Sequence, residues 1–248
     1  TSVDCAEITD IAINTNPLSN IKEKTIFFLK NYLLGSKKRE IANRIIKKIN
    51  IKKDINNLLN PKKFSKKVKI HYIDHHIAHI ASAFYPSNLD NATGLSIDGF
   101  GDFCSIVIAK CENEKINIVK KIFFPDSLGI FYESFTQLIG FKNYGDEYKM
   151  MGLSSYGEPK YYDIILKNLF KEEKGIKLNL KYFNHTDKNY SYKFQGRPEQ
   201  NNLFSHNLKN LLNIDELSIG NITDLQKDLA SSVQKVFEHK LFEIIKEI

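Results

Sequence analysis

Cysteines are few in this sequence, and long apolar runs are absent. The 248 residues include three cysteines, Cys5, Cys104 and Cys111, and no two of them form a CxxC pair. Count and spacing argue against a disulfide framework and a zinc–cysteine cluster, and they indicate a reduced, cytoplasmic compartment. No apolar run reaches the length of a membrane-spanning helix, and the first residues show no secretory signal pattern.

Internal repeats and low-complexity linkers are also missing. Hydrophobic residues make up 42% of the chain and aromatic residues 12%, which is typical of a globular protein with a sizeable core. The length suits one large domain, or one domain and part of another. Because the chain begins at Thr1 and ends within an expected helix, we expect it to be a piece of a longer protein.

Basic residues are concentrated in one stretch. The chain has a net charge of +7, but residues 21–70 hold 16 Lys and Arg against 3 Asp and Glu, which leaves a net charge of −6 for the rest. Such a stretch suits nucleic-acid binding. It has few aromatic side chains that could stack on bases, however, so we favour a solvated helical face.

The order of the expected elements predicts a mixed α/β fold. Residues 20–59 have the apolar spacing of helices and are interpreted as a helical insertion or linker. Strands are expected at four places further along: 68–74, 92–98, 105–110 and 116–124. The last three suit an antiparallel hairpin or meander with a glycine turn. We therefore divide the chain into residues 1–66, a strand end with the helical insertion, and residues 67–248, the α/β domain.

Histidine, aspartate and glycine residues in the middle of the chain suggest a metal and phosphate site. His75 and His79 are four residues apart on an expected helix, so both imidazoles project from one face and can reach one metal ion. Asp98 ends an expected strand, and Gly99 and Gly101 follow it, where a turn would let the backbone approach a phosphate. This order suits a metal ion that bridges the protein and a phosphorylated ligand.

The same residues have simpler explanations. Two histidines at helical spacing also occur as a surface or core pair, and a DGFG segment is also an ordinary hairpin turn. His76 is rotated by about 100° around the helix from His75, so it is expected to pack or to support the site. The helix itself is expected to have Asp74 as its cap and to end before Pro86.

Later segments add candidate ligand-binding residues. A helix is expected after Ser127 as its cap, and residues 144–159 are dense in Gly, Tyr and charge, which is typical of a ligand-lining loop. Within this loop, Lys149 and Glu147 are candidates for shaping the nucleotide or substrate side of a cleft. Arg197 lies in a rigid loop that could present it to an anion, although a surface turn with a solvated Arg explains it equally well.

Two further histidines have no partner at ligand spacing. His185 and His206 lie in polar segments, so both are expected at the surface. A last helix is expected to begin at Asn221 or Thr223 and to run to the end of the chain.

Five segments resemble, in this order, the motifs of one family. They are HHIAHIASAFYPS (75–87), DGFGD (98–102), FPDSLGIFYESFTQLIGF (124–141), YGDEYKMMGLSSYGEP (144–159) and DLASSVQKVFE (228–238). Together they resemble the O-carbamoyltransferases of the nodulation-factor and antibiotic-tailoring type. The resemblance covers roughly residue 67 to the C-terminus, with a fainter echo at Asn16 and Pro17.

This resemblance implies a fold and an activity. The fold is actin-like and sugar-kinase-like (ASKHA, ATPase-type), here incomplete, and is related to the enzymes that transfer threonylcarbamoyl to tRNA. A separate C-terminal domain would make carbamoyl-adenylate from carbamoyl phosphate and magnesium-bound ATP. The N-terminal part would then pass the carbamoyl group to a hydroxyl of a small-molecule or saccharide acceptor, as a cytoplasmic carbamoyltransferase.

The resemblance also implies roles for single residues. His75 and His79 of the HHxAH motif would hold iron(II) or another divalent metal, and Asp98 would be a further metal or phosphate-side ligand. Asp98 or His79 is the candidate base for the acceptor hydroxyl. Backbone N–H groups at Gly99 and Gly101 would contact phosphate, and one more aspartate of the family would lie beyond the end of this chain.

The chain departs from the family pattern in places. Residues 154–157 are SSYG where the family has APYG, and Asp126 stands where the family often has His. Both changes affect the expected acceptor geometry more than the reaction class. A first phosphate loop and the adenylate-forming domain are not found in the sequence, so we expect that this polypeptide alone does not turn over.

Two other functions stay open. The hydrogenase-maturation carbamoyl carrier shares an HHxxH helix, but it does not share the SAFYPS or YKMMGLSSYGEP contexts. A non-catalytic protein that binds nucleic acid or protein through the basic residues 21–70 belongs to a different class, and a steep salt dependence of binding would favour it.

Overall fold

The computed structural model describes residues 7–32, 68–171, 175–187, 190–194, 198–215 and 217–247. Their contacts divide the chain into two compact units. Unit 1 comprises residues 1–96 and 101–121, and unit 2 comprises residues 97–100 and 122–248. The boundary predicted at residue 66 lies outside the described residues and stays a prediction. None of the described helices combines the length and the apolar character that crossing a membrane requires.

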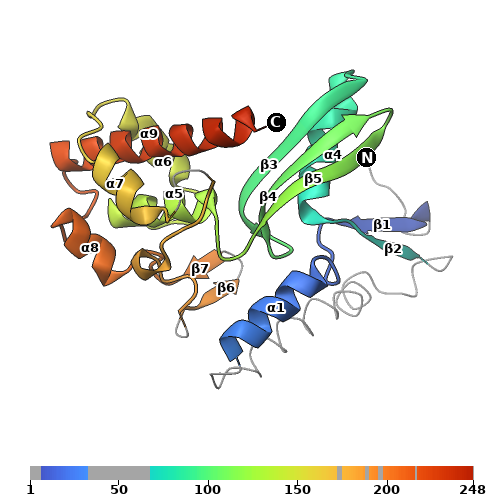
Figure 1. The fold of residues 1–248 in the computed structure, drawn as a ribbon, viewed down its shortest axis with the longest axis horizontal. Helices are drawn as coiled ribbons and strands as arrows, with labels where there is room; N and C mark the ends of the chain where they lie inside the picture. The colour runs from blue at the N-terminus through green and yellow to red at the C-terminus, as the bar shows by residue number, and fades with distance from the viewer. Residues whose placement is uncertain are drawn as a thin grey trace. The chain divides into compact units, whose positions relative to one another are not determined.

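Unit 1 begins with a parallel strand pair (Figure 1). Strand β1 (Asp10–Ile13) pairs in parallel with β2 (Lys69–Tyr72), and helix α1 (Ile21–Tyr32) lies in the connection between them. Helix α4 (His75–Phe84) follows β2 and passes into a single 3₁₀ turn, η3 (Tyr85–Ser87), which contains the proline expected to end it. The remainder of the predicted helical insertion lies outside the described residues.

Three strands follow in a sheet of order β3-β4-β5. They are β3 (Asn91–Gly101), β4 (Cys104–Glu112) and β5 (Lys115–Phe123). Each turn between them has two residues, and both residues have a positive φ: 50° and 73° in the first turn, 49° and 63° in the second. This conformation is that of the tight turns that join antiparallel hairpins, so the predicted meander is confirmed.

The predicted glycine turn is wrong. Gly99 and Gly101 lie within β3, and Asp102 and Phe103 form the turn instead. Asp tolerates the left-handed region because its short side chain can hydrogen-bond locally, whereas Phe gives no sequence signal for it. The strand therefore runs three residues further than the pattern indicated.

Unit 2 is largely helical. Its elements are α5 (Leu128–Leu138), α6 (Glu147–Ser154), α7 (Tyr162–Leu169), η4 (Leu180–Tyr182), β6 (Tyr192–Phe194), β7 (Pro198–Gln200), α8 (His206–Leu212) and α9 (Asp224–Lys246). Helix α9 packs against α5, α6 and α7, and β6 pairs antiparallel with β7. Two predicted caps are confirmed: Ser127 Oγ accepts from Ile130 N at 3.1 Å, and Thr223 forms a capping box with Gln226.

Two of the five motif segments, 144–159 and 228–238, contact each other in unit 2. The carboxylate of Asp228 on α9 accepts from Glu158 N at 2.8 Å and from Lys160 Nζ at 2.6 Å. One turn further along, Ser232 Oγ accepts from Tyr161 N at 2.9 Å. A Cβ on Gly157 would lie 2.2 Å from the Lys227 backbone, so this position requires glycine. The segment after α6 is therefore fixed by α9.

Candidate metal centre

Helix α4 presents two histidines that face each other. His75 Nε2 and His79 Nε2 are 3.1 Å apart, and the ring centroids are 4.6 Å apart with an interplanar angle of 78°. Two nitrogen ligands at ~2.1 Å from one tetrahedral or octahedral ion lie about 3.0–3.4 Å apart. A hydrogen bond between the two rings gives an N···N distance of this length, and so does one cation bound by both nitrogens.

A backbone carbonyl selects the tautomer of His75. The Asn14 carbonyl oxygen lies 3.3 Å from His75 Nδ1. Because a carbonyl can only accept, this contact places the ring proton on Nδ1 and leaves the Nε2 lone pair directed toward His79. In metal-binding histidines, the ring nitrogen that does not bind the metal typically donates to a carbonyl or carboxylate, which fixes the ring orientation.

Asp98 supplies a third donor. One donor atom from each of His75, His79 and Asp98 lies within 4.8 Å of the other two. The backbone N–H of Gly99 donates to Asp98 Oδ1 at 2.6 Å, which orients the carboxylate. Two imidazoles and one carboxylate form a ligand set found for Zn²⁺ and for non-haem Fe²⁺. The structure thus brings together the three residues predicted as ligands, and their metal-binding role stays a prediction.

The two glycines near Asp98 have different surroundings. A Cβ on Gly101 would lie 1.9 Å from Cδ2 and 2.3 Å from Cγ of His75, so the imidazole packs directly on this backbone. A Cβ on Gly99 would meet nothing within 4 Å. Gly101 is therefore required by the histidine, while the space beside Gly99 is open. The phosphate contacts predicted for both residues stay predictions.

The start of α5 approaches the Asp98 backbone closely. Ser127 Oγ lies 3.1 Å from the carbonyl oxygen of Asp98 and 2.8 Å from that of Gly99. A Cβ on Gly129 would lie 2.9 Å from the Asp98 carbonyl carbon and oxygen. The helix cap and this glycine together fix the strand where it carries Asp98.

A carboxyl group on α5 has a strongly shifted pKa. Burial of Glu133, with a smaller contribution from the negative charge of Glu147, raises its pKa to about 7. Asp98 acts in the same direction, and a hydrogen bond from Gln200 Nε2 opposes the shift. Sequence reasoning missed Glu133, because its burial and its neighbours come from segments far apart in the chain.

His76 has a structural role. It is fully buried, with Nε2 at 3.0 Å from the Cys104 carbonyl oxygen and Nδ1 at 2.8 Å from Ser96 Oγ. The carbonyl accepts, so Nε2 carries the proton and Nδ1 accepts from the serine hydroxyl. Both ring nitrogens are satisfied by the sheet, as expected for a packing residue.

His185 is buried, and its predicted surface position is wrong. It is 7% exposed, with ring centroids of Phe100, Phe124 and Phe183 at 5.7–6.0 Å, and its Nε2 donates to the Pro125 carbonyl at 2.9 Å. Burial lowers its pKa to about 4. His206 is exposed at the start of α8, as predicted.

The remaining predicted ligand-binding residues lie elsewhere. Lys149 and Glu147 are in α6, where Lys149 Nζ is 2.7 Å from Asp146 Oδ1, and this hydrogen bond raises the pKa of Lys149. Arg197 lies outside the described residues. Asp126, where the family resemblance often implies His, accepts from Leu178 N at 2.9 Å and so fixes a loop. The binding roles of Lys149 and Arg197 stay predictions.

Comparisons with known proteins identify the family. Residues 23–248 match the family described as carbamoyltransferase N-terminus. The chain belongs to this family. The resemblance inferred from the five motifs is therefore confirmed, and all three candidate metal ligands lie within the matched residues.

Individual relatives align over shorter stretches. The nodulation protein NolNO of Sinorhizobium fredii is 36% identical over 91 residues, which are 37% of this chain and 13% of that protein. The nodulation protein NolO of Bradyrhizobium diazoefficiens is 38% identical over 92 residues, 36% and 16% of the two chains. Protein sll1178 of Synechocystis is 44% identical over 114 residues, 45% and 18%. The chain thus covers less than a fifth of the length of each of these three relatives.

Proposed function

We propose that this chain is the metal-binding part of an ATP-dependent O-carbamoyltransferase. The enzyme would transfer a carbamoyl group from carbamoyl-adenylate to a hydroxyl group of a small-molecule or saccharide acceptor. One observation carries the proposal: His75, His79 and Asp98 converge in a chain of the carbamoyltransferase N-terminal family.

The proposed step is an acyl transfer. The acceptor oxygen attacks the carbamoyl carbon and forms a new C–O bond, while the bond from that carbon to the adenylate phosphate oxygen breaks. AMP leaves with the bonding electrons, and the hydroxyl proton passes to a base. The candidate bases are the carboxylate of Asp98, through the oxygen that does not bind the metal, and the imidazole of His79 where it does not bind the metal.

The residues present fit a divalent metal. His75, His79 and Asp98 would hold Fe²⁺ or a similar ion, and the Asn14 carbonyl keeps the first imidazole in the tautomer that binding through Nε2 requires. When bound, such an ion supplies a positive charge that neutralises phosphate and polarises the reacting group.

The proposal includes the ATP-binding, actin-like fold. Its supports are a parallel strand pair with a helix in the connection and a meander followed by a capped helix. The open space beside Gly99 leaves room for a phosphorylated ligand next to Asp98, whose Oδ1 accepts from the Gly99 N–H. We place a phosphate at Gly99 rather than at Gly101, because Gly101 is covered by His75, and the Gly99 N–H would exchange its bond to Asp98 for one to the phosphate.

Metal titration tests this proposal. We expect the chain to bind one Co²⁺, used as a spectroscopic substitute for Fe²⁺, and His75→Ala, His79→Ala and Asp98→Asn each to weaken binding at least ~100-fold. The control is His206→Ala, which removes an exposed histidine of unit 2 and should leave the affinity unchanged. Unchanged Co²⁺ affinity in all three site variants rejects the site.

A further inference from the structure

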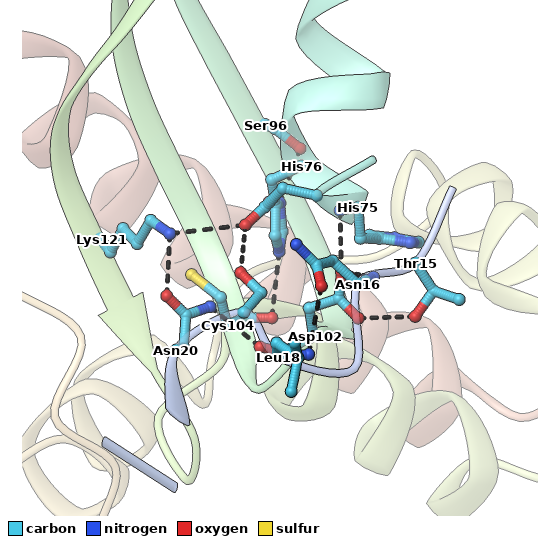
Figure 2. Close-up of polar contacts among 12 residues, drawn as sticks. Thr15, Asn16, Leu18, Asn20, His75, His76, Ser96, Asp102, Cys104 and Lys121 are labelled. Carbon is cyan, nitrogen blue, oxygen red and sulfur yellow. Dashed lines mark hydrogen bonds and ion pairs between the residues drawn. The ribbon is translucent and has the colours of Figure 1, made fainter. Parts of the chain in front are cut away.

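A second aspartate, four residues after Asp98, is buried beside α4. Asp102 is 4% exposed and lies in the turn after β3 with a φ of 50°. Its carboxylate accepts three hydrogen bonds: from Thr15 Oγ1 at 2.6 Å, from Asn16 N at 2.8 Å and from His75 N at 2.9 Å (Figure 2). A buried carboxylate is costly unless donors surround it, so this one joins three segments firmly.

Asp102 contributes to the capping of α4. Asp74 occupies the N-cap position, but its side chain makes no cap hydrogen bond. It accepts instead from Ser19 Oγ at 2.5 Å and lies 3.5 Å from Lys121 Nζ. Burial raises the pKa of Asp74, but the Ser19 hydrogen bond and the Lys121 charge outweigh burial and hold it below its usual range. The first backbone N–H of the helix, that of His75, is thus satisfied by Asp102.

The same carboxylate fixes the group that selects the His75 tautomer. Asn14, whose carbonyl oxygen faces His75 Nδ1, directly precedes the two residues that Asp102 binds. One side chain therefore anchors the backbone of His75 and the neighbouring carbonyl that orients its ring. Asn20 strengthens this arrangement, because its Nδ2 donates to the Asp102 carbonyl at 2.9 Å and its Oδ1 accepts from Lys121 at 2.8 Å.

We propose that Asp102 is a positioning residue of the metal centre, which keeps His75 in its Nδ1–H tautomer by holding residues 14–16 against the start of α4. This inference rests on the proposed metal site. It also extends the site to residues that precede position 23, where the family match begins. A carboxylate that served the fold alone would have no effect on the ring tautomer of one histidine.

Two readouts on the full chain test the inference. Ring ¹⁵N NMR of the metal-free protein at pH 8 reports the tautomer of His75, and Co²⁺ titration reports the affinity of the site. For Asp102→Asn we expect a shift of His75 toward the Nε2–H tautomer and an affinity weakened ~10–100-fold. Thr15→Val removes one of the three donors and should produce smaller changes in the same directions. Asp90→Asn, at an exposed position just before β3, is the control and should change neither readout.

The outcomes separate this inference from the proposed function. A folded Asp102→Asn variant with the wild-type tautomer and affinity overturns the inference, and so does an Asp102→Asn variant that unfolds while Thr15→Val changes neither readout. If the wild-type chain binds no Co²⁺, the proposed metal site fails. The tautomer comparison then decides whether Asp102 positions His75.

Discussion

At the residue scale, three histidines within five positions have three different environments. His75 and His79 share one face of α4, whereas His76 points into the sheet and satisfies Ser96 and the Cys104 carbonyl. The helical period separates these roles, because adjacent residues are rotated by about 100° while residues four apart are nearly aligned. Burial then decides the chemistry: the enclosed ring is held by the sheet, and the two others can bind a ligand.

Glu133 leads to a prediction about pH. Its folded-state pKa is about 7, against 4.5 for an ordinary glutamate, because burial, Glu147 and Asp98 disfavour the charge. Between these values the folded chain holds a proton that the unfolded chain has lost, so the free energy of unfolding falls as the pH rises from 4.5 to 7. Glu133→Gln keeps the shape and an acceptor for Gln200 but cannot ionise.

We therefore expect Glu133→Gln to be more stable than the wild type at pH 8, by ~1–3 kcal/mol, with the difference shrinking toward zero at pH 4. Urea unfolding at a series of pH values measures it. Glu114→Gln, at an exposed turn position, is the control and should show no such pH-dependent gain. A pH-independent difference for Glu133→Gln would contradict the assigned cause.

At the element scale, β3 serves both the sheet and the candidate metal centre. It carries Asp98, and three residues later its backbone at Gly101 lies against the His75 ring. The strand thus places the carboxylate while leaving room for the imidazole. A side chain at Gly101 would collide with the His75 ring, so this glycine contributes to the candidate site through its missing Cβ.

Gly101→Ala tests this role of the strand. A Cβ only 1.9 Å from the His75 ring must displace the imidazole, so we expect Co²⁺ affinity to fall at least ~10-fold and unfolding free energy to fall by ~1–3 kcal/mol. Gly152→Ala in α6 is the matched control, because its Cβ meets nothing within 4 Å and alanine favours a helix. Unchanged affinity in Gly101→Ala would show that the ring moves aside without loss of the site.

At the scale of the whole molecule, the sequence predicted what local patterns determine. Helices α5 and α9 were predicted with their caps, because a cap is read within a few residues of the apolar stripe. The role of Asp102 was not predicted, and the surface position predicted for His185 was wrong, because the groups around both side chains come from distant segments. The Asp102 carboxylate accepts from Thr15, 87 positions away, and the His185 ring lies against Phe100 and Phe124, which are far from it in the sequence. Spacing indicated the candidate metal ligands, but only the fold shows what orients them.

Metal binding should be visible in the stability of the protein. A ligand that binds only the folded state raises the free energy of unfolding by about 2.7 kcal/mol at 100 times its dissociation constant. The three candidate ligands come from α4 and β3, which are separated along the chain, so an unfolded chain would not hold them together.

We expect Co²⁺ at that excess to raise the unfolding temperature and to slow hydrogen exchange at the α4 amides. The double variant with His75→Ala and His79→Ala should lose both effects, whereas His206→Ala should retain them. An equal rise in the double variant would place the stabilising ion at another site.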